Sequence, residues 1–541
     1  MEAARTESAS APLPLEEMTV PPAETGRVRV DSTGHGESVL VRVPDGRWVR
    51  LHGSRDPVRE ANALLEAAFL DREPSCVIAV GVGFGYLLDA VAARSNRTRV
   101  LALEPFSATV PYLKARPIVA EWLASGRLTL LVAPRFDGAT EAWQAVDASD
   151  PAPPVVFHPV IQREFRMECA QAYGLSVRIM QGARENEQAR QAFSGRYLLQ
   201  SIGNLPRICR EGDAAGLADA FPSVPAVVVG AGPSLDSTLD ALRALAGRVV
   251  IVATDTSLRP LLAAGIAPQI VVAVDPSELN ARHLSGVRVT GETWLVAEGS
   301  LHPSVFDAFD RRTFFCRVSD HEPWRWLRTC GLDCGHVRTW GSVLTTAFDV
   351  AHRAGCNPIV FFGADMAYTD GLPYCRNTIY ERDWVNYKTP AELSAAFLPG
   401  LANRPTCTEP DIAGKPVLTA PHFLQFRDWL VSRASARDRC VLNATGGGIL
   451  HGGGIQQIQA AGLRFDPLPL DVQAVLARAW TTTRRRQVAT RSRLTVAARA
   501  GASAVPLEAW LAATVGRVSA HHVTDALARA VEGFAFGGEA F

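Results

Sequence analysis

The stretch AVVVGAGPSLD, at residues 226–236, combines an apolar run with residue types that could bind a phosphate. Gly230 and Gly232 allow a sharp turn and a close approach of a ligand to the backbone. Pro233 suits the first position of a helix, and Ser234 then presents its hydroxyl and N–H at the helix N-terminus, where the dipole favours an anion. The stretch lacks the third glycine of a dinucleotide site and the lysine of a P-loop. It predicts either a single phosphate site or a tight turn without a ligand.

Acidic side chains follow the later apolar runs of the same region. Asp255 and Thr256 come after VVIVAT, Asp275 after IVVAV and Asp365 after IVFFGA, and Glu298 ends TWLVAE. The carboxyl ends of parallel strands lie along one edge of a sheet, where ligands bind, so we expect these residues to be neighbours of the glycine turn. Such carboxylates can contact a ribose, hold Mg²⁺, or act as a general base when burial raises their pKa.

Two helix starts add to this edge. In DPSE, Asp275 fits the N-cap position with Pro276 at the first helical position, a role compatible with ligand contact. In GSVLTTAFDVA, Gly341 and Ser342 begin a helix, which gives a second N-terminus that favours an anion.

Two tyrosines follow the last of these carboxylates, in ADMAYTDGLPYC. Tyr368 and Tyr374 could protonate a leaving group, as tyrosines can. The alternative is a purely structural turn.

A second glycine-rich turn lies near the N-terminus, in VGVGFGY. Gly81, Gly83 and Gly85 precede the strand RVLALE, which ends in Glu104. This spacing resembles an adenosylmethionine pocket in which the carboxylate binds the ribose, so methyl transfer is one alternative. A packing turn without a ligand is the other.

No pattern in the chain predicts a metal site. The cysteines form no C-x-x-C pair, and the histidines form no H-x-x-x-H pair. We expect the ten cysteines to be reduced thiols of a cytoplasmic protein.

The overall composition excludes several classes of partner. Lys+Arg and Asp+Glu are 55 each in 541 residues, so no bulk charge indicates nucleic acid or a membrane surface. The N-terminus has no apolar segment typical of a secretory signal, and no apolar run is long enough for a transmembrane helix. We therefore expect a cytoplasmic protein with no nucleic-acid or membrane partner, and its oligomeric state stays open.

Alternating strand and helix patterns place these residues in an α/β protein. We expect a Rossmann-like central domain with a second, N-terminal α/β domain and a helical C-terminal region. The expected divisions are a disordered leader at 1–25, the N-terminal domain at 26–168, a helical connector at 169–210, the central domain at 211–375, a continuation of the core with a glycine-rich loop at 376–465, and the helical C-terminal domain at 466–541.

The ordered set of motifs from residue 225 to 371 resembles the motility-associated factor (Maf) family of flagellin glycosyltransferases. The set consists of VVVGAGPSLD, VIVATDTSLRPLLAAGIAPQIVVAVDP and WGSVLTTAFDVAHRAGCNPIVFFGADMAYTDG. More thinly, VIAVGVGFGYLLDAV and LNATGGGILHGGG are similar to that family's flanking segments. The central domain is also similar to an archaeal 6-hydroxymethylpterin diphosphokinase.

The resemblance implies transfer of a nonulosonic acid, of pseudaminic or legionaminic type, from a CMP-activated donor to Ser or Thr hydroxyls of flagellin. The glycine turn and the helix at Gly341 would stabilise the leaving phosphate, and Asp275 or Asp365 would be the base. Family members often carry a His shortly after AYT, where this chain has Tyr374. The CMP-sugar is the donor substrate, no cofactor is required, and Mg²⁺ stays an option.

Two other functions stay open. A diphosphokinase using ATP and Mg²⁺ would explain the carboxylates and leave the flanking segments without a role. A flagellin-binding accessory factor without catalysis would explain the flanking segments and leave the nucleotide site unused.

Overall fold

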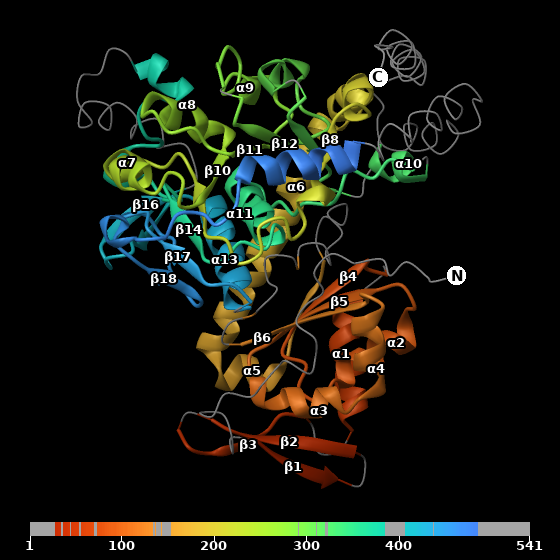
Figure 1. The fold of residues 1–541 in the computed structure, drawn as a ribbon. Coiled ribbons are helices and arrows are strands. Elements are labelled where there is room, and N and C mark those ends of the chain that lie inside the picture. Colours follow the sequence, from red (N-terminus) through yellow and green to blue (C-terminus); the bar gives the residue numbers. More distant parts are fainter. Residues whose placement is uncertain are drawn as a thin grey trace. The chain divides into compact units, whose positions relative to one another are not determined.

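The computed structural model describes residues 28–33, 36–43, 45–52, 56–69, 73–133, 136, 142, 153–289, 291–309, 311–319, 323–329, 331–384, 406–436 and 438–484 (Figure 1). The chain forms two compact units, Met1–Arg190 and Gln191–Phe541. The helix α6, Arg166–Ile208, contains the boundary and spans the segment expected as a connector. The expected leader at 1–25 and residues 485–541 of the expected C-terminal domain lie outside the described residues.

The first unit contains a four-stranded parallel sheet with the order β6-β5-β4-β7. Its strands are apolar on both faces, as expected for a sheet that helices cover. A separate antiparallel sheet, β1-β2-β3, includes the hairpin that the Pro-Asp-Gly turn predicts. The elements are β1 Val28–Thr33, β2 Gly36–Arg42, β3 Trp48–Arg50, α1 Pro57–Phe69, β4 Cys76–Val80, α2 Tyr86–Arg94, β5 Arg99–Glu104, α3 Val110–Lys114, α4 Pro117–Ala124, β6 Leu128–Val132, β7 Val155–Phe157 and α5 Pro159–Glu164.

The second unit is built on a nine-stranded sheet with the order β18-β17-β14-β9-β10-β11-β12-β13-β8. Neighbouring strands of this sheet pair in parallel throughout the described residues. The strands are β8 Gly212–Asp213, β9 Ala226–Val229, β10 Val250–Thr254, β11 Ile270–Ala273, β12 Trp294–Glu298, β13 Thr313–Cys316, β14 Ile359–Phe362, β17 Val441–Asn443 and β18 Ile455–Gln457. The helices are α7 Leu235–Ala244, α8 Asp255–Ala263, α9 Glu278–Ala281, α10 Trp324–Thr329, α11 Val343–Arg353 and α13 Pro421–Ser435, and a small hairpin pairs β15 Cys407–Pro410 with β16 Pro416–Thr419.

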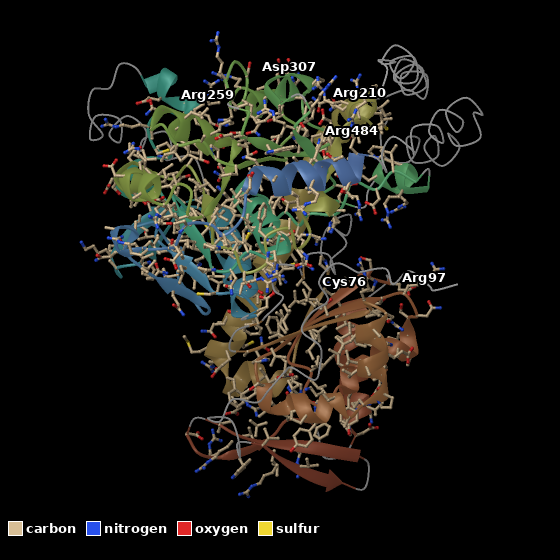
Figure 2. All side chains as sticks on the ribbon, viewed as in Figure 1. Cys76, Arg97, Arg210, Arg259, Asp307 and Arg484 are labelled. Carbon is tan, nitrogen blue, oxygen red and sulfur yellow. The ribbon has the colours of Figure 1, made fainter. Side chains whose placement is uncertain are left out.

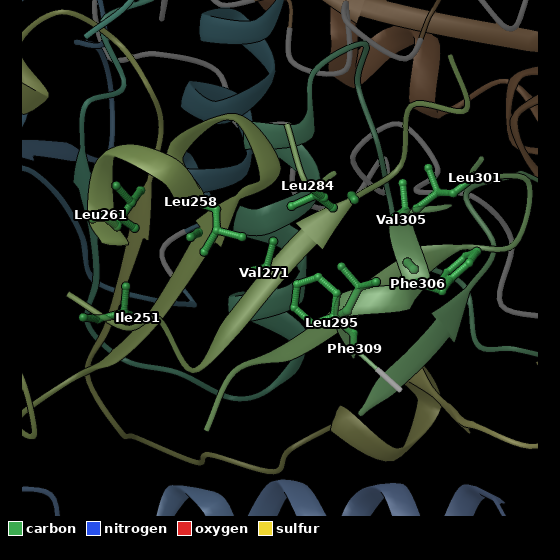
Figure 3. Close-up of a cluster of buried hydrophobic side chains, with 14 of the residues drawn as sticks. Ile251, Leu258, Leu261, Val271, Leu284, Leu295, Leu301, Val305, Phe306 and Phe309 are labelled. Atoms are coloured by element: carbon green, nitrogen blue, oxygen red, sulfur yellow. The ribbon is translucent and has the colours of Figure 1, made fainter. Parts of the chain in front are cut away.

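Two hydrophobic clusters lie on opposite faces of this sheet, because successive strand residues point to opposite sides. Val227 of β9 joins the cluster that includes Leu258 and Leu261 of α8, part of which Figure 3 shows. The next residue, Val228, joins the cluster that includes Phe348 of α11 and Trp429 of α13. The α/β class expected from the sequence is therefore confirmed.

Residues 472–484 are helical and pack on the same core. Trp480 donates its indole N–H to Glu211 Oε2 and to the Thr313 carbonyl, at 3.0 and 3.1 Å. The guanidinium of Arg484 lies 5.1 Å from the Trp480 ring and donates to the Arg210 carbonyl (Figure 2). The described part of the C-terminal segment thus completes the second unit, since it covers the β13 and β8 end of the sheet.

The structure assigns none of the described cysteines to a disulfide, and most of them are buried. None of the described helices combines the length and the apolar character that a membrane span needs.

Candidate functional site

The chain direction along the sheet reverses next to β9. From β9 the chain proceeds outward through β10, β11, β12 and β13, and then returns to place β14 on the other side of β9. Ligands of open parallel sheets bind at such a switch point, beyond the carboxyl ends of the strands. The glycine turn after β9 and the loop after β14 meet there, as Gly232 N donates to the Gly363 carbonyl at 2.8 Å.

Ser234 and Asp365 are bonded to each other across this point. The backbone N–H of Ser234 donates to Asp365 Oδ1 at 3.2 Å, and its hydroxyl donates to Oδ2 at 2.7 Å. Burial raises the pKa of Asp365 to about 6, while the bonds from Ser234 oppose that shift. A Cβ on Gly232 would lie 2.0 Å from Asp365 Oδ2, so only glycine fits beside the carboxylate.

This contact changes two expectations. We expected the N–H and hydroxyl of Ser234 to face a phosphate, but a carboxylate of the chain itself occupies that position. We also expected Asp365 to be available as a base, but both of its oxygens accept hydrogen bonds from Ser234. The helix α7 begins at Leu235 with Ser234 at the cap position, so Pro233 lies just outside the helix rather than at its first position.

Asp255 is fully buried at the start of α8. Its Oδ1 accepts from the N–H and the hydroxyl of Thr256, at 2.7 and 3.1 Å, and its Oδ2 accepts from Asn280 Nδ2 at 2.6 Å. Burial raises the pKa of Asp255 to about 6, and the charge of Asp275 adds to that rise. Asp255 therefore holds its neighbours in place and does not itself face solvent.

Asp275 is exposed beyond β11. Its Oδ1 accepts from Ser277 N at 2.8 Å, which closes a short turn, and Ser277 Oγ accepts from Asn280 N at 3.1 Å. The N-cap of α9 is thus Ser277, two residues after the expected one, because the chain makes this extra turn before the helix. The burial on which we based a role for Asp275 as a base is absent.

The N-terminus of α11 lies at the same edge. Ser342 is its N-cap, and its hydroxyl accepts from Leu344 N at 3.3 Å. Gly341 has φ +68° and is exposed, and a Cβ there would lie 2.8 Å from the Phe426 ring. Leu344 reaches the glycine turn, since its Cδ1 would lie 3.4 Å from a Cβ on Gly230. Gly230 and the start of α11 therefore lie close together, as expected.

The two candidate tyrosines lie in different surroundings. Tyr368 is buried, packs against Phe423 and donates its backbone N–H to Leu418. Tyr374 stacks on Tyr380, with ring centroids 4.6 Å apart and an interplanar angle of 12°. Burial raises the pKa of Tyr374 well above its usual value, and the neighbouring Tyr380 adds to the rise. A phenol that holds its proton more tightly is a weaker general acid, which disfavours that role for Tyr374.

Three further side chains of this edge were not expected from the sequence: Asn280, His283 and Tyr380. The ring of His283 lies 5.5 Å from that of Tyr380. Asn280 lies five residues after Asp275, which is a weak sequence signal. Tyr380 follows the expected strand by too many residues to be assigned.

Glu298 belongs to the fold and not to the site. Its Oε2 accepts from the N–H and the hydroxyl of Ser300, and its Oε1 accepts from the indole N–H of Trp324 at 2.7 Å. Burial raises the pKa of Glu298, and these bonds oppose the rise.

The glycine-rich turn of the first unit is closed by its own side chains. Glu104 Oε2 accepts from Val82 N and Gly83 N, at 2.9 and 3.0 Å, and its Oε1 accepts from Phe106 N. A Cβ on Gly81 would lie 2.2 Å from Ile161, and one on Gly83 would lie 2.5 Å from His52 Nε2. The carboxylate that we considered for ribose binding is therefore committed to the turn, which favours the packing alternative over methyl transfer.

Two buried histidines next to this turn predict acid lability of the first unit. Burial lowers the pKa of His52 to about 4 and that of His158 to about 3. The unfolded chain takes up these protons near pH 6.5, so the stability that both residues contribute is present above that pH and is lost as pH falls through about 4 and 3. Burial raises the pKa of Glu104 to about 7, so the folded chain takes up this proton at a higher pH than the unfolded chain. Glu104 therefore stabilises the first unit as pH falls from 7 to 4.5 and opposes the effect of the histidines.

We therefore expect hydrogen-exchange protection of β4 and β5 to fall gently from pH 6.5 to 4.5, where Glu104 offsets part of the loss, more steeply from pH 4.5 to about 4, and little further below about 3. The variant His158→Phe, which cannot take up a proton, should flatten the steep part. Equal pH dependence in the variant and the parent would contradict the assignment.

The comparisons with known proteins bear on the second unit. Residues 199–371 match the 6-hydroxymethylpterin diphosphokinase MptE-like family. This range contains β9 to β14, the glycine turn, Asp255, Asp275 and Asp365, and it ends before Tyr374 and Tyr380.

Among solved structures, the chain is similar to a MAf glycosyltransferase from Magnetospirillum magneticum AMB-1. The identity is 15%, the likeness covers 96% of this chain and 87% of that one, and the TM-score is 0.48. A spermidine synthase in complex with the transition-state analogue AdoDATO is similar over 27% of this chain and 52% of that one, with 15% identity and a TM-score of 0.18. No curated protein sequence matches the chain. The MptE-like family that the central motifs resemble thus recurs in the comparisons over residues 199–371.

Proposed function

We propose that the chain is a glycosyltransferase that binds a nucleotide-activated sugar at the carboxyl ends of β14, β9, β10 and β11. The observation that carries the proposal is the convergence of separate motif residues at one sheet edge. These residues come from three stretches of the sequence: Ser234, Asp255, Asp275 and Asp365 follow the adjacent parallel strands β9, β10, β11 and β14, and Ser342 caps the N-terminus of α11. The proposed donor is a CMP-activated nonulosonic acid, and the proposed acceptor is a Ser or Thr hydroxyl of flagellin, in the cytoplasm.

The geometry assigns different tasks to the two helix N-termini at this edge. The start of α7 is occupied by the carboxylate of Asp365. The start of α11, at Gly341 and Ser342, is partly exposed and carries no such carboxylate among the contacts of the described residues. It is therefore the N-terminus suited to a leaving phosphate, whose charge the helix dipole stabilises.

Within this proposal, Asp275 is the base that takes the proton of the acceptor hydroxyl. It is exposed, and its Oδ1 alone is used by the turn to Ser277. The acceptor oxygen attacks the anomeric carbon, the bond to the phosphate oxygen breaks, and CMP leaves with that bond's electron pair. Asp365 and Tyr374 are less suited to proton transfer for the reasons given above.

A second candidate is an ATP-dependent diphosphokinase, which the family match over residues 199–371 favours. A metal-dependent kinase needs carboxylates that face the metal. Asp255 and Asp365 are instead engaged with Asn280, Thr256 and Ser234. Their orientation favours the glycosyltransferase.

Calorimetric titration with CMP, CDP and ATP, each with and without Mg²⁺, separates the candidates. We expect CMP to bind without a metal, and co-expressed flagellin to gain the mass of a nonulosonic acid. Asp275→Asn should keep CMP binding within about twofold and lower transfer by about 10²-fold or more, the usual effect of losing a general base. Binding of ATP only with Mg²⁺ would support the diphosphokinase, and glycosylated flagellin in the Asp275→Asn strain would exclude this residue as the base.

A further inference from the structure

The buried pair Asp255 and Asn280 fixes the direction of an amide group at the ends of β10 and β11. A carboxylate only accepts hydrogen bonds, so the nitrogen of the Asn280 amide must face it, as the 2.6 Å contact records. The carbonyl oxygen Oδ1 is on the other arm of the planar amide and therefore points away from Asp255. No hydrogen bond among the described residues uses this oxygen, and the side chain is half-buried.

The rigidity of this arrangement comes from Asp255, which cannot reorient. Thr256 holds its Oδ1 through two hydrogen bonds, and the carboxylate is 0% exposed. Asn280 is held a second time through its backbone, since its N–H donates to Ser277 Oγ at 3.1 Å. An acceptor fixed in this way costs little further ordering when a ligand binds.

Aromatic rings flank the same place. The backbone N–H of His283 donates to the backbone carbonyl of Asn280 at 3.0 Å. Burial raises the pKa of Tyr380, and the charges of Asp255 and Asp275 add to the rise. Tyr380 stacks on Tyr374 on one side and meets the edge of His283 on the other, at 5.5 Å and 69°. His283 is 1% exposed, and its Nδ1 has no hydrogen-bond partner among the described residues. Buried polar atoms are nearly always paired in native structures. His283 Nδ1 is therefore available for a hydrogen bond to a group outside the described residues.

The groups that this place offers are mainly acceptors with negative charge near them. A partner must therefore bring hydrogen-bond donors and no negative charge of its own. The ribose of a nucleotide fits this description, because its two neighbouring hydroxyls donate, and the acidic end of the strand after a glycine turn is where nucleotide-binding sheets hold ribose. The phosphate would then lie toward the start of α11, away from the buried carboxylate of Asp255.

We propose that Asn280 binds the ribose hydroxyls of the donor nucleotide and that Asp255 is a positioning residue that aims it. The inference rests on the proposed function, because it takes the ligand of this edge to be a nucleotide. It assigns the preference for a ribonucleotide over a deoxyribonucleotide to Asn280, a side chain that takes no part in the transfer reaction itself.

The test compares the binding of CMP and of 2′-deoxy-CMP by calorimetry. The parent chain should bind CMP about 10-fold more tightly, the effect of one well-placed hydrogen bond. Asn280→Ala should weaken CMP by about 10-fold and remove the difference between the two nucleotides. Asp255→Asn, which can turn its own amide away from Asn280, should also reduce the difference. Asn62→Ala serves as the matched control, because Asn62 is a half-buried helical asparagine of the first unit that bonds Arg94.

The outcomes are distinguishable. An unchanged ratio in Asn280→Ala, or equal binding of both nucleotides to the parent chain, overturns the ribose subsite and leaves the proposed function standing. If neither CMP nor ATP binds the parent chain under any condition, the proposed function fails and the subsite fails with it. A lower affinity of Asn280→Ala for both nucleotides with the ratio preserved identifies a merely structural role and also overturns the inference.

Discussion

Asp365→Ala should lower the free energy of unfolding of the second unit by about 3 kcal/mol. The substitution removes the acceptor of the Ser234 hydroxyl and N–H, which then stay buried without partners, at a cost of about 1–3 kcal/mol. It also removes a carboxylate from the N-terminus of α7, where a negative charge contributes about 0.3–2 kcal/mol. Loss of transfer is expected as well, because the glycine turn loses the contact that holds it to the loop after β14.

Chemical denaturation at pH 7, with intact-mass analysis of co-expressed flagellin, measures both effects. Ser234→Ala removes one hydrogen bond and leaves the carboxylate in place, so it should cost only about 1 kcal/mol. If Asp365 acted as a base without a structural role, Asp365→Ala would abolish transfer at unchanged stability. That pattern would contradict the positioning role derived from its contacts.

Gly448→Ala should cost about 4 kcal/mol or prevent folding of the second unit. The residue has φ +75°, and a Cβ there would lie 2.1 Å from the Asp365 carbonyl oxygen and 2.4 Å from its Cα. Backbone atoms cannot move aside as a flexible side chain can, so overpacking adds to the strain of the left-handed conformation, which alone costs about 1–2 kcal/mol.

Gly414→Ala is a matched control for this variant. Gly414 has φ +80° and no atom within 4 Å of a built Cβ, so only the conformational strain should remain, about 1 kcal/mol. Soluble yield and urea midpoints of the two variants give the comparison. Gly446→Ala, with φ +84° and a nearest contact of 3.9 Å, should behave like Gly414→Ala. Similar losses for Gly448 and Gly414 would show that the packing around Asp365 is not tight.

Much of the fold follows from local patterns. The apolar runs at 226–229, 250–254, 270–273 and 359–362 are strands because each is short and buried on both faces. The carboxyl-edge positions of Asp255, Asp275 and Asp365 follow from the same patterns, since each residue lies within the first few positions after a strand. The order of the strands does not follow, because it depends on contacts between residues far apart in the chain.

The roles within the candidate site were predicted less well. Ser234 was expected to hold a phosphate, but residue 365, which is 131 positions later, occupies its donors. Ribose binding by Glu104 was one of two alternatives, and Glu104 instead accepts from the N–H groups of its own turn, as the packing alternative implies. In both cases the residue type indicated a group that forms hydrogen bonds, but the sequence did not indicate its partner. A carboxylate near unpaired N–H groups bonds to them unless a ligand competes.

The sequence by itself determined the α/β alternation, the positions of the turns and the residue types at the carboxyl edge, because these depend on periodicity and on the conformations of Gly and Pro. Only the tertiary structure decided that β14 lies beside β9, that Asp365 closes the start of α7, and that Asp255 accepts a hydrogen bond from Asn280. The physical reason is that a hydrogen bond depends on distance and direction in space. Sequence patterns indicate which groups can donate or accept hydrogen bonds, and the order of the strands determines which of these groups lie close enough to bond.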